Sequence, residues 1–327
     1  MKSFVITEKD AGARLDKYVA KVAPALPKSL LYKHIRTKNI KLNRKRAEIS
    51  TRLQAGDVLD LYINDEFFVS AAPKYDFLNA GGQLDIVYED ENILLADKKQ
   101  GLIVHPDKNE FRDTLIGRIQ KYLYEKGEYD PQAENAFCPA LANRIDRNTG
   151  GIVLAAKNAA ALRVLCDKIK TREIDKYYLA VCHGTPMKKE DVLQGYLVKD
   201  EEKNQVFIRN APVPGGRLAK THYRVLASKN GLSLLEVELL TGRTHQIRAQ
   251  MAHIGHPLLG DGKYGKNAAD KRMGYKHQAL YSYRLRFNFT EDAGLLNPLN
   301  GRTFTVKDVW FANELFDYDV KVEKPTL

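Results

Sequence analysis

The sequence predicts an α+β fold with a mixed, mostly antiparallel central sheet, preceded by a small basic α/β domain. In the larger part of the chain, strand-like and helix-like segments mix without the strict βαβ alternation of a doubly wound sheet. The excess positive charge is concentrated in the first fifth of the 327 residues. A stretch with proline, glycine and little periodicity separates the two parts. We therefore expect a domain at residues 1–64, a linker at 65–83 and a second domain at 84–327.

The first domain is expected to contain two short helices, a basic turn and a closing strand. Apolar side chains at i, i+3, i+4 and i+7 predict an amphipathic helix over residues 15–22. Two prolines then interrupt it, and a second helix is expected from Ser29. Residues 41–46 are predicted to form a basic turn, and the apolar run over 58–63 is strand-like.

Charge gives this first domain its expected partner. Residues 1–64 contain 14 of the 52 Lys and Arg residues but 6 of the 41 Asp and Glu residues, so they carry +8 of the formal charge of +11. Clustered cations release counterions when they neutralise phosphates, which favours binding of a polyanion. The alternative is a solvated basic surface. The candidate contacts lie on or beside the second helix and in the basic turn: Lys28, Arg36, Lys38, Lys41, Arg44, Lys45 and Arg46.

Composition excludes several classes of protein. No window approaches the ~18 consecutive apolar residues of a membrane span, and the first thirty residues lack the apolar core of a signal peptide. We therefore expect a cytoplasmic protein without membrane contact, and the polar surface gives no reason to expect more than a monomer. Cys138, Cys166 and Cys182 are odd in number and widely spaced, so we expect them to be reduced and buried.

The second domain carries the elements of the expected sheet. Strands are predicted at residues 84–88, 93–96, 151–156, 177–182 and 232–240, and helices at 112–125, 158–171 and 244–254. In the middle helix, Leu162, Leu165 and Ile169 share one face.

One carboxylate stands out as a candidate reactive group. Asp146 lies between Arg144 and Arg147 in a polar turn closed by Gly150-Gly151. Opposite charges nearby favour the ionised form of a carboxyl group, so Asp146 is a candidate nucleophile or base. The alternative is a surface turn held by salt bridges.

Two further side chains can be expected near this turn. The segment 241–248 opens a helix on which Arg248 would face a site at the strand ends and could pair with Asp146. Tyr178, in a predicted strand, offers a ring on which a nucleobase could stack. Tyr178 also points the same way as Ala180 and Cys182, so a purely structural core tyrosine is the alternative.

Two patterns suggest cofactors and are discounted. The glycines of residues 260–265 spell G-x-G-x-x-G, but no βαβ unit surrounds them. His245, His253 and His256 cluster without Asp, Glu or Cys at matching helical spacing, as a metal site would need. We therefore predict no cofactor and no metal.

Three segments of the second domain together resemble the signature of the RluA family of pseudouridine synthases. They are residues 143–151, 241–248 and 252–261. The resemblance extends over the whole second domain, and the arrangement is most similar to the RluC and RluD branches, which act on large-subunit ribosomal RNA.

The first domain resembles a known module as well. Its pattern is similar to the alpha-L RNA-binding module first seen in a small-subunit ribosomal protein. The residues that carry this resemblance are Arg14-Leu15-Asp16, Ser29-Leu30-Leu31, Lys41-Leu42-Asn43 and Gly56-Asp57.

The family resemblance implies roles for individual residues. Asp146 would be the essential aspartate, Tyr178 the tyrosine that stacks on uracil, and Arg248 the arginine that pairs with the aspartate. Arg144 would enter the RNA stack as the uridine flips out. Further RNA contacts are expected from neighbouring basic side chains: Arg147, Arg243 and His245.

The sequence departs from the family pattern at three places. Asn143 stands where the family usually has His, Gly150 where Ser is common, and Lys99-Gln100 where Pro-Ala often follows Asn-Lys. None of these differences removes a catalytic group.

We therefore expect an RNA pseudouridine synthase acting on large-subunit ribosomal RNA. The same isomerisation on tRNA and a non-catalytic RNA-binding or ribosome-assembly protein are the alternatives. A glycoside hydrolase is disfavoured because that chemistry generally uses two carboxylates, whereas one lies in a motif here. The sequence leaves open whether Asp146 attacks the anomeric carbon or removes the neighbouring 2′ proton.

Overall fold

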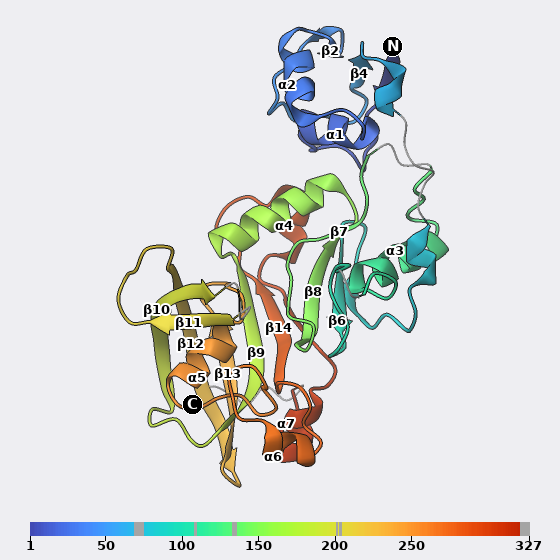
Figure 1. Cartoon of the computed structure of the whole chain (residues 1–327). Coiled ribbons are helices and arrows are strands. Elements are labelled where there is room, and N and C mark those ends of the chain that lie inside the picture. The colour runs from blue at the N-terminus through green and yellow to red at the C-terminus, as the bar shows by residue number, and fades with distance from the viewer. Residues whose placement is uncertain (69–74, 108–109, 133–135, 201, 203–204, 321–327) are drawn as a thin grey trace.

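A computed structural model describes residues 1–68, 75–107, 110–132, 136–200, 202 and 205–320. The chain forms two parts, each with its own sheet and its own apolar core. Figure 1 shows the smaller part, the N-terminal module, beyond one end of the large central sheet. The larger part, residues 75–320, is called the C-terminal part below.

The N-terminal module packs two helices on a four-stranded sheet of order β1-β4-β2-β3. Its elements are β1 (Lys2–Val5), α1 (Leu15–Val22), α2 (Lys28–Arg36), β2 (Ile40–Leu42), β3 (Lys45–Arg46) and β4 (Val58–Leu61). Both predicted helices are confirmed, with buried Leu15, Val19, Leu31 and Ile35 facing the sheet core. Strand β1 was not predicted, since its four residues are mostly exposed and carry little alternation.

The predicted basic turn is a tight β-hairpin. Asn43 and Arg44 connect β2 to β3 and both have positive φ, +50° and +64°. Two consecutive left-handed residues form the turn type that matches the twist of paired strands. The hairpin leaves Lys45 and Arg46 exposed to solvent.

The predicted linker 65–83 includes residues 69–74, which lie outside the described residues. On its two sides are short 3₁₀ helices, η1 (Asp65–Phe68) and η2 (Asp76–Asn79). Phe68 is buried in the core of the N-terminal module, and Phe77 is buried in a core of the C-terminal part.

The central sheet has eleven strands and confirms the predicted fold class. Its main order is β11-β10-β12-β13-β9-β14-β8-β6-β5, with β7 paired to β8 and β15 to β14. Only the β8–β14 pair is parallel among the strand pairs of the described residues. The strands are β5 (Ile86–Glu89), β6 (Ile93–Lys98), β7 (Ala140–Leu141), β8 (Gly150–Ala156), β9 (Ile174–His183), β10 (Glu190–Asp200), β11 (Gln205–Arg209), β12 (Arg217–Lys229), β13 (Leu232–Leu239), β14 (Leu280–Phe287) and β15 (Thr303–Thr305).

Helices cover the sheet and position its loops. They are α3 (Leu115–Glu125), α4 (Ala159–Thr171), α5 (Gln246–His253), α6 (Ala268–Arg272) and α7 (Trp310–Phe316), with 3₁₀ helix η3 (Gly294–Leu299). The three predicted helices are confirmed. The first starts at residue 115 rather than 112 because Thr114 caps it, accepting a hydrogen bond from the Gly117 N–H at 3.1 Å.

A buried ion pair ties the end of α4 to the chain after β14. Glu173 accepts hydrogen bonds from Lys168 Nζ at 2.7 Å, from Thr171 Oγ1 at 2.6 Å and from the Thr290 N–H at 2.8 Å. The hydrogen bond from Lys168, helped by the others, lowers the pKa of Glu173 from 4.5 to about 2.

Glu173→Gln should therefore change the acid stability of the protein. A carboxylate whose folded pKa is lowered stabilises the fold above its unfolded pKa, and this stabilisation is lost as the pH falls from about 4.5 towards 2. We expect the variant to melt at a lower temperature at pH 7 and to lose less stability than the wild type on acidification. Exposed Glu291→Gln is the matched control. Parallel melting curves of all three proteins across this pH range would contradict the assignment.

Candidate active site

The loop of residues 142–149, here the Asp146 loop, connects β7 to β8 and is supported from beneath by a buried lysine. Lys98 has no exposed surface. Its ammonium group donates to the carbonyl oxygens of Leu102 at 2.7 Å, Arg147 at 2.8 Å and Lys99 at 3.0 Å. Burial lowers the pKa of Lys98 to about 7, while the nearby charge of Asp146 opposes that shift. Three carbonyl acceptors match the three donors of an ammonium group, so Lys98 links the Asp146 loop, through the Arg147 carbonyl, to the segment 99–102.

The glycine pair at the start of β8 explains one departure from the family pattern. A Cβ on Gly150 would lie 2.2 Å from the Tyr281 ring, and one on Gly151 would lie 2.2 Å from the Ser282 carbonyl oxygen. Tyr281 is fixed there by the hydrogen bond that it donates to Asp97 at 2.7 Å. The Tyr281 ring thus occupies the space that the Cβ of a serine at position 150 would need.

The other departures have structural roles. Asn143 Oδ1 accepts a hydrogen bond from the Leu154 N–H at 2.8 Å and so joins the Asp146 loop to β8. Gln100 donates to the carbonyl oxygens of Asn148 at 3.2 Å and Gln278 at 2.9 Å.

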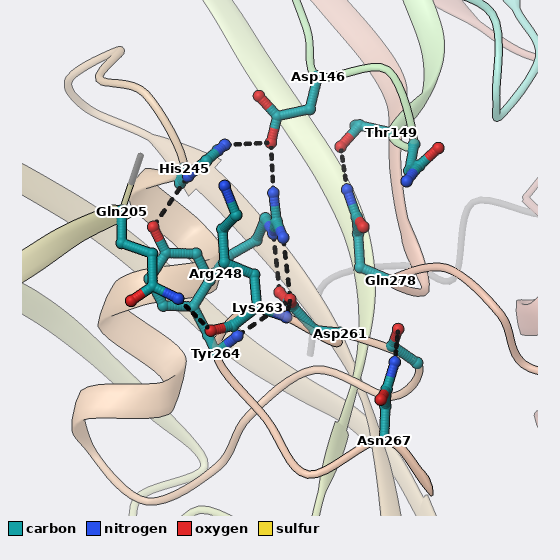
Figure 2. A network of polar contacts seen from close by, with 12 residues as sticks. Asp146, Thr149, Gln205, His245, Arg248, Asp261, Lys263, Tyr264, Asn267 and Gln278 are labelled. Carbon is teal, nitrogen blue, oxygen red and sulfur yellow. Dashed lines mark hydrogen bonds and ion pairs between the residues drawn. The ribbon is translucent and has the colours of Figure 1, made fainter. Parts of the chain in front are cut away.

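The predicted pairing of Arg248 with Asp146 is present, within a larger ion-pair network (Figure 2). Arg248 Nη1 donates to Asp146 Oδ2 at 2.9 Å. The same guanidinium donates through Nε to Asp261 Oδ2 at 2.7 Å and through Nη2 to Asp261 Oδ1 at 2.9 Å. Asp146 keeps 27% of its side chain exposed, whereas Asp261 is fully buried. Arg248 therefore holds the accessible carboxylate from the protein interior.

Asp261 is a site residue that the sequence analysis missed. Burial alone would raise the pKa of its carboxyl group, but Arg248 holds that pKa below the ordinary value. Its Oδ1 also accepts the N–H groups of Lys263 at 2.9 Å and Tyr264 at 3.2 Å. Asp261 lies in the segment 252–261 that carries the family resemblance, so its place in that motif could have indicated a site residue.

His245 lies just before α5 and approaches the same Asp146 oxygen as Arg248. Its φ of +54° is unusual for a residue with a side chain, and it directs Nε2 to 3.7 Å from Asp146 Oδ2. His245 Nδ1 is 2.8 Å from the hydroxyl of Tyr264. Burial lowers the pKa of His245, which favours the neutral imidazole.

Tyr178 is a buried strand residue that also lines the cavity. It is 5% exposed and packs with Ala180 and Cys182 in one apolar cluster, as the strand alternation predicts. It also lines the cavity in front of Asp146. Burial, with a smaller contribution from the Asp146 charge, raises the pKa of Tyr178 to about 12, so the phenol is protonated at neutral pH.

The cavity in front of these groups is large and positively charged. Its volume is about 1060 Å³, and its wall runs between residues 103 and 280. The predicted RNA contacts Arg144, Arg147, Arg243 and His245 all line it. Charged wall residues comprise Arg144, Arg147, Lys176, Arg243, Arg248, Lys263, Lys271 and Lys276 against Asp107 and Asp146. Lys263, Lys271 and Lys276 were not predicted as contacts, although the segment 263–276 is visibly basic.

The predicted RNA contacts of the first domain lie elsewhere. Residues 28–46 belong to the N-terminal module, outside the range of residues that line the cavity. Two of these cations cover aromatic rings: Lys28 lies 5.6 Å from the Tyr32 ring centre and Lys41 lies 5.1 Å from that of Tyr62. The chain therefore has two separate basic regions.

Two histidines of the discounted cluster, His253 and His256, have polar partners within the protein. His253 Nε2 is 3.1 Å from Asn210 Oδ1, and His256 Nδ1 is 2.9 Å from the His183 carbonyl oxygen. Within the described residues, no three His, Cys, Asp or Glu side chains are grouped as metal ligands would be. All three cysteines were expected to be buried, but only Cys182 is: Cys138 is half-buried, and Cys166 is exposed because it lies on the outer face of α4.

Among the helices of the described residues, none has both the length and the hydropathy that crossing a membrane requires.

Comparison with known proteins identifies the family. Residues 92–253 match the model of the RNA pseudouridylate synthase family. An RNA pseudouridine synthase of Mycoplasma genitalium is 31% identical over 292 residues, covering 87% of this chain and 88% of that protein. The ribosomal large subunit pseudouridine synthase C of Vibrio cholerae is 30% identical over 292 residues, covering 86% of this chain and 87% of that protein.

Solved structures support the fold. The human RNA pseudouridylate synthase domain containing 4 aligns with a TM-score of 0.55 at 21% identity, covering 74% of this chain and 95% of that chain. Together these findings show that the chain belongs to the RluA family of RNA pseudouridine synthases. It is an isomerase that acts on RNA, and its relatives include both C-type and D-type enzymes.

Proposed function

We propose that this protein converts specific uridines of large-subunit ribosomal RNA into pseudouridine, with Asp146 as the reacting group. The observation that carries the proposal is the accessible Asp146 carboxylate, 2.9 Å from the guanidinium of buried Arg248, at the wall of a cavity whose charged residues are mostly cations. Such a wall attracts the phosphates of RNA, while the Asp146 side chain remains accessible to the ribose.

The reaction breaks the bond between the uracil N1 and the ribose C1′, and forms a bond between C5 and C1′. The proton on C5 is lost, and N1 gains a proton. Asp146 attacks C1′ or removes the neighbouring 2′ proton, and in either route the hydrogen bond from Arg248 orients its carboxylate. Because redox state does not change and no group is donated, the proposed reaction uses no cofactor.

The target nucleotide has to leave the RNA stack to reach Asp146. Extrusion of a base costs a few kcal/mol. We propose that Arg144 fills the vacated position and that the Tyr178 ring stacks on the freed uracil. The protonated phenol of Tyr178 can also donate a hydrogen bond to the base.

The choice of ribosomal RNA is supported by relatives named as ribosomal large subunit pseudouridine synthases. Ribosomal RNA and tRNA, each labelled with tritium at uridine C5, can be prepared from a strain that lacks the gene. Purified protein is expected to release tritium from the large-subunit RNA and not from tRNA. If tritium is released from tRNA and not from ribosomal RNA, the substrate is tRNA and the proposal of ribosomal RNA is wrong. We also propose that the protein acts as a cytoplasmic monomer.

We propose that residues 1–64 form an RNA-binding domain that strengthens binding to the substrate. Its exposed hairpin cations are the proposed contacts, and each phosphate neutralised contributes about 0.7 to 0.9 to the slope of log affinity against log salt. Lys45→Gln/Arg46→Gln should therefore flatten that slope by up to about 2. Lys188→Gln/Lys189→Gln, an equally exposed pair in the C-terminal part, is the control. Equal slopes for both variants and the wild type would refute the role of the hairpin.

A further inference from the structure

The N-terminal module is attached to the C-terminal part by more than the connecting chain. One turn of the module, residues 9–12, contacts three separate segments of the C-terminal part. The Lys9 carbonyl oxygen accepts the Ala159 N–H at 2.9 Å, and Lys9 Nζ donates to the Glu128 carbonyl oxygen at 2.7 Å. Asp10 Oδ1 accepts the Phe137 N–H at 2.7 Å.

The residues that make these contacts are buried or closely packed on both sides. Asp10 is fully buried, and its second oxygen accepts a hydrogen bond from Thr7 Oγ1 at 2.9 Å. Ala159 is the first residue of α4, where N–H groups lack partners within the helix. Gly12, with φ of +84°, brings the turn so close to α4 that a Cβ on it would lie 3.3 Å from the Ala160 Cα. The turn therefore supplies the hydrogen-bond acceptor that the first N–H of α4 lacks within the helix.

The length of β8 gives the distance between this contact and the active site. The Asp146 loop precedes β8, and α4 starts just after it. Strand β8 has seven residues. At about 3.3 Å per residue, the two ends of such a strand are roughly 20 Å apart. Figure 1 shows the N-terminal module beyond the α4 end of β8, with β2 on its far side from the central sheet.

We infer that the module is held at a fixed place, so that its basic hairpin and the cavity bind two points of one RNA at least about 20 Å apart. This inference rests on the proposed function of the module. The full substrate is then an RNA that continues as a duplex or a compact fold for at least about 20 Å beyond the target uridine. An isolated short hairpin can bind the cavity but is too short to reach the basic hairpin of the module as well.

The consequence is measurable as avidity. Two linked sites of fixed geometry raise the affinity for a ligand that spans both, by about 10² or more in favourable cases, and give nothing for a ligand that reaches one. The module should therefore raise the affinity for a long RNA hairpin but not for a short one.

The test compares two RNA hairpins with the same uridine-containing loop, one with a stem of 4 base pairs and one with 16. Affinities are measured by fluorescence anisotropy with the full-length chain. Asp10→Ala removes the acceptor of the Phe137 N–H, and Ala160→Glu places a longer side chain against Gly12. Asp10→Asn retains an acceptor oxygen and is the matched control. Small-angle X-ray scattering on each variant reports whether the module has been released.

We expect the wild type and Asp10→Asn to bind the long hairpin at least about tenfold more tightly than the short one. Asp10→Ala and Ala160→Glu should expand in scattering and lose most of that ratio, with binding of the short hairpin unchanged. An unchanged ratio in expanded variants would overturn the fixed spacing, and unexpanded variants would overturn the role of the turn.

These failures differ from failure of the proposed function. If Lys45→Gln/Arg46→Gln leaves the binding of both hairpins unaltered, the module does not bind RNA, and the proposed RNA-binding role falls. If that variant weakens the binding of both hairpins equally, the module binds RNA but the fixed spacing is wrong.

Discussion

Asp146→Asn is expected to lower tritium release from RNA labelled at uridine C5 at least about a thousandfold, while RNA affinity stays nearly unchanged. An amide has neither the charge to attack C1′ nor the basicity to remove a 2′ proton. Arg248 keeps both of its hydrogen bonds to Asp261, so the variant should fold normally.

Asp107→Asn is the matched control for this experiment. Asp107 also lines the cavity and also contacts an arginine, with its Oδ2 3.3 Å from Arg147 Nη2, but it is about half exposed. We expect this control to retain most of the activity. Undiminished release by Asp146→Asn, measured in single turnover, would remove Asp146 from the reaction.

Replacing Arg248 should damage both activity and stability. Arg248→Met leaves Asp261 as a fully buried carboxylate without its cation, and breaking a buried ion pair in this way typically costs about 3–5 kcal/mol. The backbone N–H groups of Lys263 and Tyr264 remain, so we expect the lower part of that range in urea unfolding. Asp146 also loses its orienting partner, so activity should fall strongly.

A second substitution separates these two effects. In Arg248→Met/Asp261→Asn the buried negative charge is gone, while the Asn oxygen can still accept from the backbone. We expect the double variant to recover much of the lost unfolding free energy but none of the activity, which would identify Arg248 as a residue that positions Asp146. Recovery of activity in the double variant would show instead that Arg248 acts only through stability.

Local sequence patterns predicted the elements that their own residues determine. Helical periodicity identified α1 and α4, and strand-like runs identified β8 and β9. Residues 190–229 were not recognised as strands, because β10 to β12 bury few of their side chains and carry many charges. Their pairing depends on neighbours distant in sequence, which a local pattern does not contain.

The candidate site shows the same limit. Asp146, Tyr178 and Arg248 could be proposed from motifs, and the structure brings all three to one cavity. Asp261 and Lys98 were missed because their importance lies in burial: each is a charge without solvent, supporting a group at the surface of the cavity. The docking turn at residues 9–12 was also invisible, since its partners come from three remote segments.

The central claim, isomerisation of ribosomal uridines through Asp146, is tested most directly by mapping pseudouridine in large-subunit ribosomal RNA. The map is compared between a strain that lacks the gene, the same strain expressing the wild-type protein, and the same strain expressing Asp146→Asn. We predict that at least one pseudouridine disappears without the gene, returns with the wild type and does not return with the variant. An identical map in all three strains would contradict the claim.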